Sequence, residues 1–218
     1  MTKKRFVAIL LCMTLVALAA IGATFAYLTD SKTVNNTFTM GNVAIKLDET
    51  NVNDPTGDRV TSNAYNVYPG AVVTKDPIVH NTGKNAAYIR ATVNVSNWMN
   101  LCAAYYPESG FEFTKPGYEK SLELLVGTLG EGWSVVGVTR GDTFTISQFD
   151  AKFILKYDGK LASGADTTAM FQKVIIPAGI DNASADAGSF SSVKVVAQAI
   201  QADGFDTWED AFAAYDAK

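Results

Sequence analysis

The sequence predicts a mainly β fold: an antiparallel β-sandwich, jelly-roll-like, with one or two short peripheral helices and an N-terminal signal helix. About nine or ten short segments of strand character alternate with turn-forming residues along the chain. A parallel α/β sheet would need a helix between most strand pairs, and the sequence lacks such helices. The first residues differ from the rest, because they form one long apolar run.

The N-terminus has the pattern of a signal peptide. Basic residues near the start precede an uncharged run at residues 6–28. This run is long enough to span a bilayer, which takes about 20 apolar residues. Its end turns small, and Thr24 and Ala26 lie three residues and one residue before a cut that would free Tyr27. We therefore expect residues 1–26 to be removed as a signal peptide, and a retained membrane anchor is the alternative.

Charge and cysteine content narrow the class of protein. The 218 residues carry a net charge of −4, and the first 26 hold three of the 18 basic residues and none of the 22 acidic ones. An acidic chain of this kind has no basic surface for nucleic acid. Of the two cysteines, Cys12 lies in the apolar run, so Cys102 would be alone after cleavage. We expect no intramolecular disulfide, and a buried, inert Cys102.

The strands are expected between clear turn signals. The cleanest strand is residues 87–96, where Ile89, Ala91, Val93 and Val95 share one face and the other face meets water. Pro77 suggests an edge position or a bulge in the segment around it. The other expected strands are residues 43–47, 71–79, 134–138, 143–147, 152–157, 171–176 and 193–201.

Residues 27–218 are expected to form a single sandwich domain. Within it, residues 97–133 break the strand rhythm as a helical or loop insertion, with a short helix at 118–126. Residues 205–218 are expected to form a C-terminal helix that Asp206 or Thr207 caps.

Several segments resemble a known family. The stretch GATFAYLTDSKTVNNTFTMGNVAIKLDE, residues 22–49, resembles the N-terminus of the TasA/camelysin family, exported proteins of Gram-positive bacteria that are processed by the signal peptidase SipW. The segments at residues 68–95 and 156–179 and the closing strand VVAQAIQADGF also look like family segments, so the resemblance covers roughly half of the chain. The matching positions are Phe38, Gly41, Val43, Ile45, Pro69, Gly70, Lys75, Val79, Asn81, Gly83, Tyr88, Arg90, Gly164, Thr168, Met170, Phe171, Val174, Ile176 and Pro177.

The resemblance implies a role for the segment that cleavage would free, residues 27–40. In TasA-like fibres, such a segment of one subunit adds as a strand to the next subunit, which is β-augmentation. Here the face of the expected assembly strand carries Val34, Asn36, Phe38 and Met40. An ordinary first strand that folds into its own sheet explains the same alternation, and both interpretations remain open.

The sequence contains few residues or motifs that are typical of catalytic or metal sites. His80 is the single histidine, and the chain has neither an H-E-x-x-H nor a G-x-S-x-G motif. We therefore predict no catalytic residues, no cofactor and no metal site, and we expect His80 to lie at the surface or to cap a strand. The acidic loop at residues 48–58 fits a solvated turn better than a calcium site, because its spacing is not that of an EF-hand.

The predicted function follows from export and resemblance together. We expect a structural protein of the extracellular matrix or cell surface, a subunit or accessory component of biofilm fibres. Its partners would be further copies of itself and a SipW-type signal peptidase, and it would touch the membrane only through an uncleaved signal segment. The first alternative is a monomeric adhesion module that uses the aromatic residues of the middle region: Trp98, Tyr105, Tyr106, Phe111, Phe113 and Trp133. A camelysin-like metallopeptidase is the second alternative, and the single histidine speaks against it.

Overall fold

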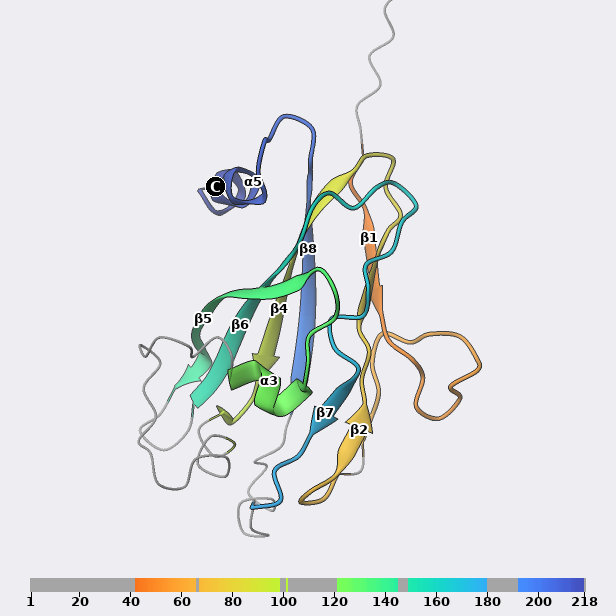
Figure 1. Cartoon of the computed structure of the whole chain (residues 1–218), viewed down its shortest axis with the longest axis vertical. Coiled ribbons are helices and arrows are strands. Elements are labelled where there is room, and N and C mark those ends of the chain that lie inside the picture. Colours follow the sequence, from red (N-terminus) through yellow and green to blue (C-terminus); the bar gives the residue numbers. More distant parts are fainter. Residues whose placement is uncertain are drawn as a thin grey trace, which may run out of the picture. The chain divides into compact units, whose positions relative to one another are not determined.

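The computed structural model describes residues 42–65, 67–98, 101, 121–144, 149–179 and 192–217, with only the backbone described at 141–144 and 149. All of these residues belong to one compact unit. The unit is mainly β and its strand pairs are antiparallel (Figure 1). The predicted mainly β, antiparallel sandwich with short helices is confirmed, and the expected N-terminal signal helix lies outside the described residues.

One layer is a four-stranded sheet in the order β5-β6-β4-β8. Its central strands are β4 (Ala87–Val95) and β6 (Phe149–Tyr157), and its edges are β5 (Trp133–Phe144) and β8 (Val193–Gln201). On the inner face of β4, the alternate residues Ile89, Ala91, Val93 and Val95 are buried, as the sequence predicts. They lie opposite Ala199, Ala197, Val195 and Val193 of β8.

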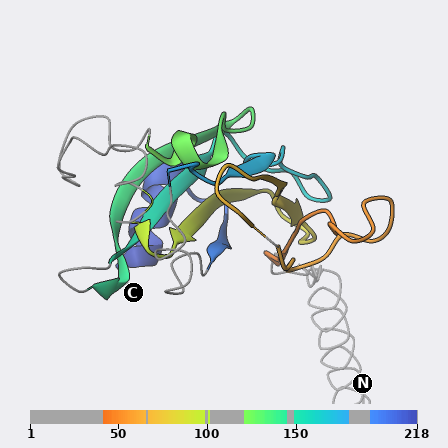
Figure 2. The same ribbon diagram turned by 90° about the horizontal axis from the view of Figure 1, so that it is seen from below.

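The opposing layer consists of two short ribbons and a helix. In one ribbon β1 (Ile45–Asp48) pairs with β3 (Ile78–Asn81), and in the other β2 (Val72–Thr74) pairs with β7 (Lys173–Ile175). The helix α3 (Ser121–Val126) contacts β7 (Figure 2). Side chains from both layers form one apolar core that contains Trp98, Leu122, Leu125, Phe153 and Phe171.

The helix α5 (Trp208–Asp216) covers part of the outer face of the sheet. Phe212 and Ala211 form a second apolar cluster with Tyr88 of β4 and Ala202. The expectation that this face of β4 meets water is therefore wrong at Tyr88, which is 4% exposed. Thr207 is the N-cap, as predicted: its hydroxyl accepts a hydrogen bond from the backbone N–H of Asp210.

Two strand predictions need correction. Residues 71–79 form two strands in different ribbons, because Pro77 lacks the N–H that a continuous ladder needs. Residues 134–138 and 143–144 belong to the single strand β5, whose register shifts between Arg140 and Phe144. The predicted residues 145–147 lie outside the described part of the chain.

Candidate assembly groove and the polar cluster beside it

A groove of about 560 Å³ lies along the start of β8. One wall is formed by Ser192 and the first three residues of β8, and another by the end of β1 and by residues 61–65. Its apolar lining is contributed by Leu47, Val67, Val73, Pro77, Val95, Leu101, Leu125, Val174, Ile176, Val193 and Val195.

The edge strand β8 pairs only with β4 among the described residues. The other edge of such a strand presents backbone N–H and C=O groups that can receive a further strand. Natural edge strands are usually short or carry charges that discourage pairing. By contrast, β8 is nine residues long and has one charged residue, Lys194. The edge of β8 that no described strand pairs with, together with the groove, therefore forms a suitable place for an added strand.

Polar residues also line the groove, and three of them, Glu49, Asn63 and Lys75, contact one another. Nζ of Lys75 donates to Oε2 of Glu49 at 2.5 Å, and Nδ2 of Asn63 donates to Oε1 of Glu49 at 3.0 Å. Nζ of Lys75 also lies 6.0 Å from the centre of the Tyr65 ring. Among the described residues, the buried hydroxyl of Tyr65 forms no hydrogen bond of standard geometry, and the side chain of Asn63 is close enough to lower its pKa in part. Burial and the charge of Glu49 raise the pKa of Tyr65 to about 12.

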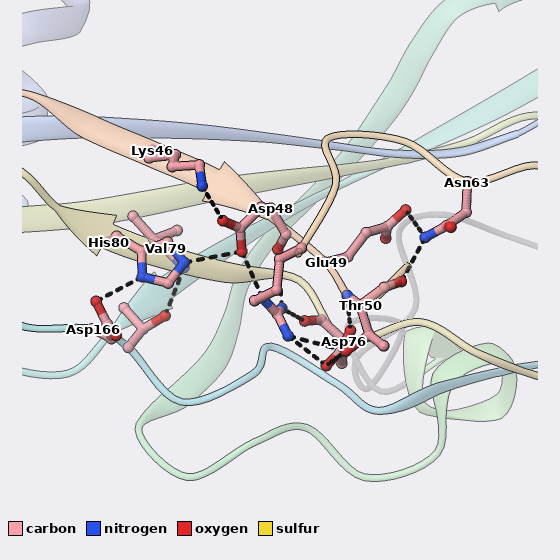
Figure 3. A network of polar contacts seen from close by, with 11 residues as sticks. Lys46, Asp48, Glu49, Thr50, Asn63, Asp76, Val79, His80 and Asp166 are labelled. Carbon is pink, nitrogen blue, oxygen red and sulfur yellow. Dashed lines mark hydrogen bonds and ion pairs between the residues drawn. The ribbon is translucent and has the colours of Figure 1, made fainter. Parts of the chain in front are cut away.

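A larger polar cluster lies next to the groove around Asp48, at the end of β1 (Figure 3). The side chain of Asp48 is 2% exposed and forms ion pairs with Arg59 at 2.6 Å, with Lys46 at 2.9 Å and with His80 at 2.9 Å. Burial alone would raise the pKa of Asp48. The hydrogen bonds from the three partners outweigh it and lower the pKa to about 2.

His80 joins three segments of the chain. On β3, its Nε2 faces Asp48 of β1 and its Nδ1 faces Asp166 at 2.7 Å (Figure 3). A neutral imidazole has one N–H and one lone pair, so it can donate to only one of these carboxylates. The protonated ring donates to both. The two carboxylates accordingly raise the pKa of His80, although partial burial acts in the opposite direction.

Arg59 connects this cluster to the loop that follows β1. Its guanidinium donates to the Asp48 carboxylate, to Oδ2 of Asp76 at 3.0 Å and to the backbone carbonyl of Asp76 at 2.7 Å. The hydroxyl and backbone N–H of Thr50 donate to the same Asp76 carboxylate, each at 2.7 Å. The loop is therefore fastened at its base to the segment between β2 and β3.

The structure corrects two predictions on polar residues. His80 was expected at the surface or as a cap, but its side chain is partly buried and both ring nitrogens contact carboxylates. The solvated-turn interpretation of the acidic loop holds for Asp54 and Asp58, which are exposed, but is wrong for Asp48 and Glu49. These two are buried because basic partners from other segments neutralise them.

The aromatic residues follow core packing where the structure describes them. Trp98 is fully buried against Phe153, with ring centres 5.1 Å apart, and Trp133 is 6% exposed. The other middle-region aromatics, Tyr105, Tyr106, Phe111 and Phe113, lie outside the described residues, as does Cys102.

The predicted cleavage and assembly residues also lie outside the described part of the chain. These are Thr24, Ala26, Tyr27, Val34, Asn36, Phe38 and Met40. Among the described residues, no helix is both long enough and apolar enough to cross a membrane.

The family motif around residues 75–83 has a structural explanation. Lys75 neutralises Glu49, and Val79 is a fully buried core residue. The amide of Asn81 donates to the carbonyls of Asn85, Leu161 and Ala162 and accepts from the N–H of Gly83. Gly83 passes so close to the backbone before β1 that a Cβ there would lie 2.6 Å from the carbonyl oxygen of Asn42. The motif therefore holds the β1–β3 ribbon together.

Residues 45–81, in the N-terminal part of the chain, contribute to the groove wall, to the β1–β3 ribbon and to the polar cluster. Residues 1–98 match the camelysin metallo-endopeptidase family. This match confirms the predicted resemblance to the TasA/camelysin family. No curated protein and no solved structure matches the chain.

The name of the camelysin family implies a metal ion, which is usually zinc in such peptidases. The described residues can be compared with the ligands that a zinc ion needs. No group of three or more His, Cys, Asp or Glu residues in the described part of the chain has a metal-binding arrangement. Both nitrogens of His80 already contact carboxylates, and the Asp48 carboxylate faces Lys46 and Arg59. A cluster that is already neutralised by its own cations does not fit a zinc ion. That the chain is not an enzyme stays a prediction.

Proposed function

We propose that the chain is an exported structural protein, a subunit or accessory component of extracellular fibres on the cell surface or in a biofilm matrix. Removal of residues 1–26 by a SipW-type signal peptidase would free residues 27–40. This segment of one copy would then add as a strand to the next copy. A head-to-tail contact that does not close on itself produces a filament.

The observation that carries this proposal is the edge of β8 beside the groove. An added strand needs unpaired backbone groups for affinity and pockets for alternate side chains for specificity. The described part of β8 offers the first, since β4 is its one partner. The apolar lining of the groove offers the second. The match of residues 1–98 to the camelysin family supports the expected processing and export.

The test compares protein that starts at Tyr27 with protein that starts at Gly41. Both are examined by size-exclusion chromatography and negative-stain microscopy, and circular dichroism establishes that both are folded. Filaments from the longer protein and monomers from the shorter one are expected, because only the longer one carries the assembly strand. Folded monomers from both would reject the proposal and favour a monomeric adhesion module.

A further inference from the structure

The large apolar side chains that the unit exposes are not spread evenly. In the described part of the chain, Val67, Tyr68 and Val72 are 38%, 70% and 61% exposed, and all three belong to the segment 67–72. The other exposed large apolar side chains lie on three separate elements, Val136 on β5, Val196 on β8 and Tyr215 on α5. Single exposed apolar residues are normal, whereas a group of them marks a contact with another molecule.

Hydrogen bonds fix the backbone that carries this exposed group. Tyr68 begins a turn in which its carbonyl accepts a hydrogen bond from the N–H of Ala71 at 2.9 Å. Gly70 within the turn has a φ of 82°, which glycine adopts without strain. The N–H of Gly70 donates to the carbonyl of Ile176 at 3.1 Å, which ties the turn to the residue that follows β7. Tyr68 and Val72 are therefore presented by an anchored turn and strand.

The exposed group borders the groove that is proposed to receive a strand. Val67 belongs to the group and also lines the groove, as does Val73 of β2. Tyr68 and Val72 are not lining residues of the groove. A strand that contacts the groove alone would leave both side chains exposed, so they are available to a second part of the incoming copy.

The segment that would be donated joins the unit near the start of β1. There Ile45 pairs with Asn81 at the end of β3. From Val72 the chain follows β2 and β3 to Asn81, which is up to about 30 Å away in extended chain. Figure 1 shows the starts of β1 and β2 toward opposite ends of the unit. A head-to-tail arrangement would bring the β1 start of the donor copy to the exposed group of the acceptor copy.

We propose that Tyr68 and Val72 of the acceptor copy form a second contact in the filament, against the loops around the β1 start of the donor copy. This inference rests on the proposed function. One of these loops contains Lys84, whose N–H donates to the carbonyl of Asn42 at 3.0 Å. In the other, at residues 162–164, the hydroxyl of Ser163 donates to the carbonyl of Gly83 at 2.7 Å.

Both loops suit an exposed tyrosine and valine. Ala162, Ser163 and Gly164 are exposed and small, so an aromatic ring can approach their backbone closely. Lys84 is also exposed, and an ammonium group over a tyrosine ring is a favourable contact.

Substitutions in the protein that starts at Tyr27 test this contact, with the critical concentration for filament formation, measured by pelleting, as the readout. Y68S should raise it about 10-fold or more, because a buried tyrosine is a typical anchor of an interface. V72T should raise it about 4-fold, which corresponds to one methyl group lost from an apolar contact. Circular dichroism of the monomers establishes that the variants are folded.

The matched controls make the same changes at exposed sites outside the group. Y215S on α5 and V136T on β5 should each change the critical concentration by less than about 2-fold. If wild-type filaments form and Y68S and V72T behave like these controls, only the second contact is rejected. If the wild-type chain forms no filaments, the proposed function itself fails.

A cross-link locates the contact without relying on either loss of assembly. In filaments, the photoreactive amino acid p-benzoylphenylalanine in place of Tyr68 should form cross-links between copies, at residues 82–84 or 162–164 of the neighbour. Mass spectrometry of filaments that mix isotopically labelled and unlabelled chains distinguishes these from cross-links within one copy. Cross-links confined to the same copy, or to other surfaces of the neighbour, would overturn the inference.

Discussion

His80 should stabilise the folded protein, and this stabilisation should decrease as the pH rises. The perturbation is His80→Leu, which removes both hydrogen bonds of the ring to Asp48 and Asp166. Neither carboxylate is left alone, since Asp48 keeps Arg59 and Lys46, and Asp166 is 58% exposed. The loss of stability therefore reports the ring itself.

The size of the effect follows from the burial of the two bonds. A hydrogen bond between charged groups contributes about 1.5–3 kcal/mol when shielded. The bond to Asp48 is of this kind, because that side chain is 2% exposed. The bond to the exposed Asp166 contributes about 0.2–1 kcal/mol. At low pH, H80L should therefore lose about 2–4 kcal/mol of unfolding free energy.

The direction with pH follows from the pKa of His80, which is raised above its ordinary value of 6.5. The folded state therefore binds the proton more tightly than the unfolded chain. The stabilisation is fully present below the unfolded pKa and is lost as the pH rises through the folded pKa. Asp48, with its pKa lowered to about 2, stays ionised throughout this range.

Urea denaturation of wild type and H80L at about pH 5.5 and about pH 9 measures the difference. It should shrink to about 1 kcal/mol or less at the higher pH, because the neutral ring keeps one hydrogen bond. Since His80 is the single histidine, its NMR titration reports its pKa without assignment. A pKa below 6.5, or a difference between the proteins that is independent of pH, would refute the reasoning.

Three further changes test the fold. G83A places a Cβ 2.6 Å from the carbonyl oxygen of Asn42 and should cost about 1–3 kcal/mol in urea denaturation, so an unchanged midpoint would contradict the close approach. F212A removes a buried aromatic side chain of the cluster under α5 and should cost about 3–5 kcal/mol, with faster chymotrypsin cleavage after Trp208 and Tyr215 of α5; unchanged cleavage there would show that α5 is held otherwise. T207A removes the N-cap of α5 and should lower the free energy of unfolding by about 1 kcal/mol, which a thermal unfolding series measures against T56A at an exposed loop site.

Local pattern was sufficient to predict much of the fold. The alternation in β4 and β8 is regular, and one face of each contributes to the core, so period-two reasoning locates both strands. The N-cap of α5 was equally predictable, because Thr207 stands directly before the acidic first turn. Pairing between distant segments was not predictable from local pattern. Residues 71–79 look like one strand in the sequence, but in the fold β2 pairs with β7 and β3 pairs with β1.

The polar cluster was missed for the same reason. Arg59 lies 11 positions and His80 lies 32 positions from Asp48 in the sequence. No motif or regular spacing indicates that these three residues meet. The buried Asp48 and Glu49 look like loop carboxylates until their basic partners are in place. The Lys75 position of the family motif was the one signal for this part of the molecule, because its partner Glu49 directly follows β1, the strand that the motif helps to hold.

The central claim is that β8 receives a strand from another copy. Backbone hydrogen exchange, compared between monomers and filaments of the protein that starts at Tyr27, measures this at each amide of Val193–Gln201. We predict that the β8 amides that do not donate to β4 exchange quickly in monomers and become protected in filaments, while the adjoining β4 amides change little. Filaments in which exchange from β8 is as fast as in monomers would contradict the account.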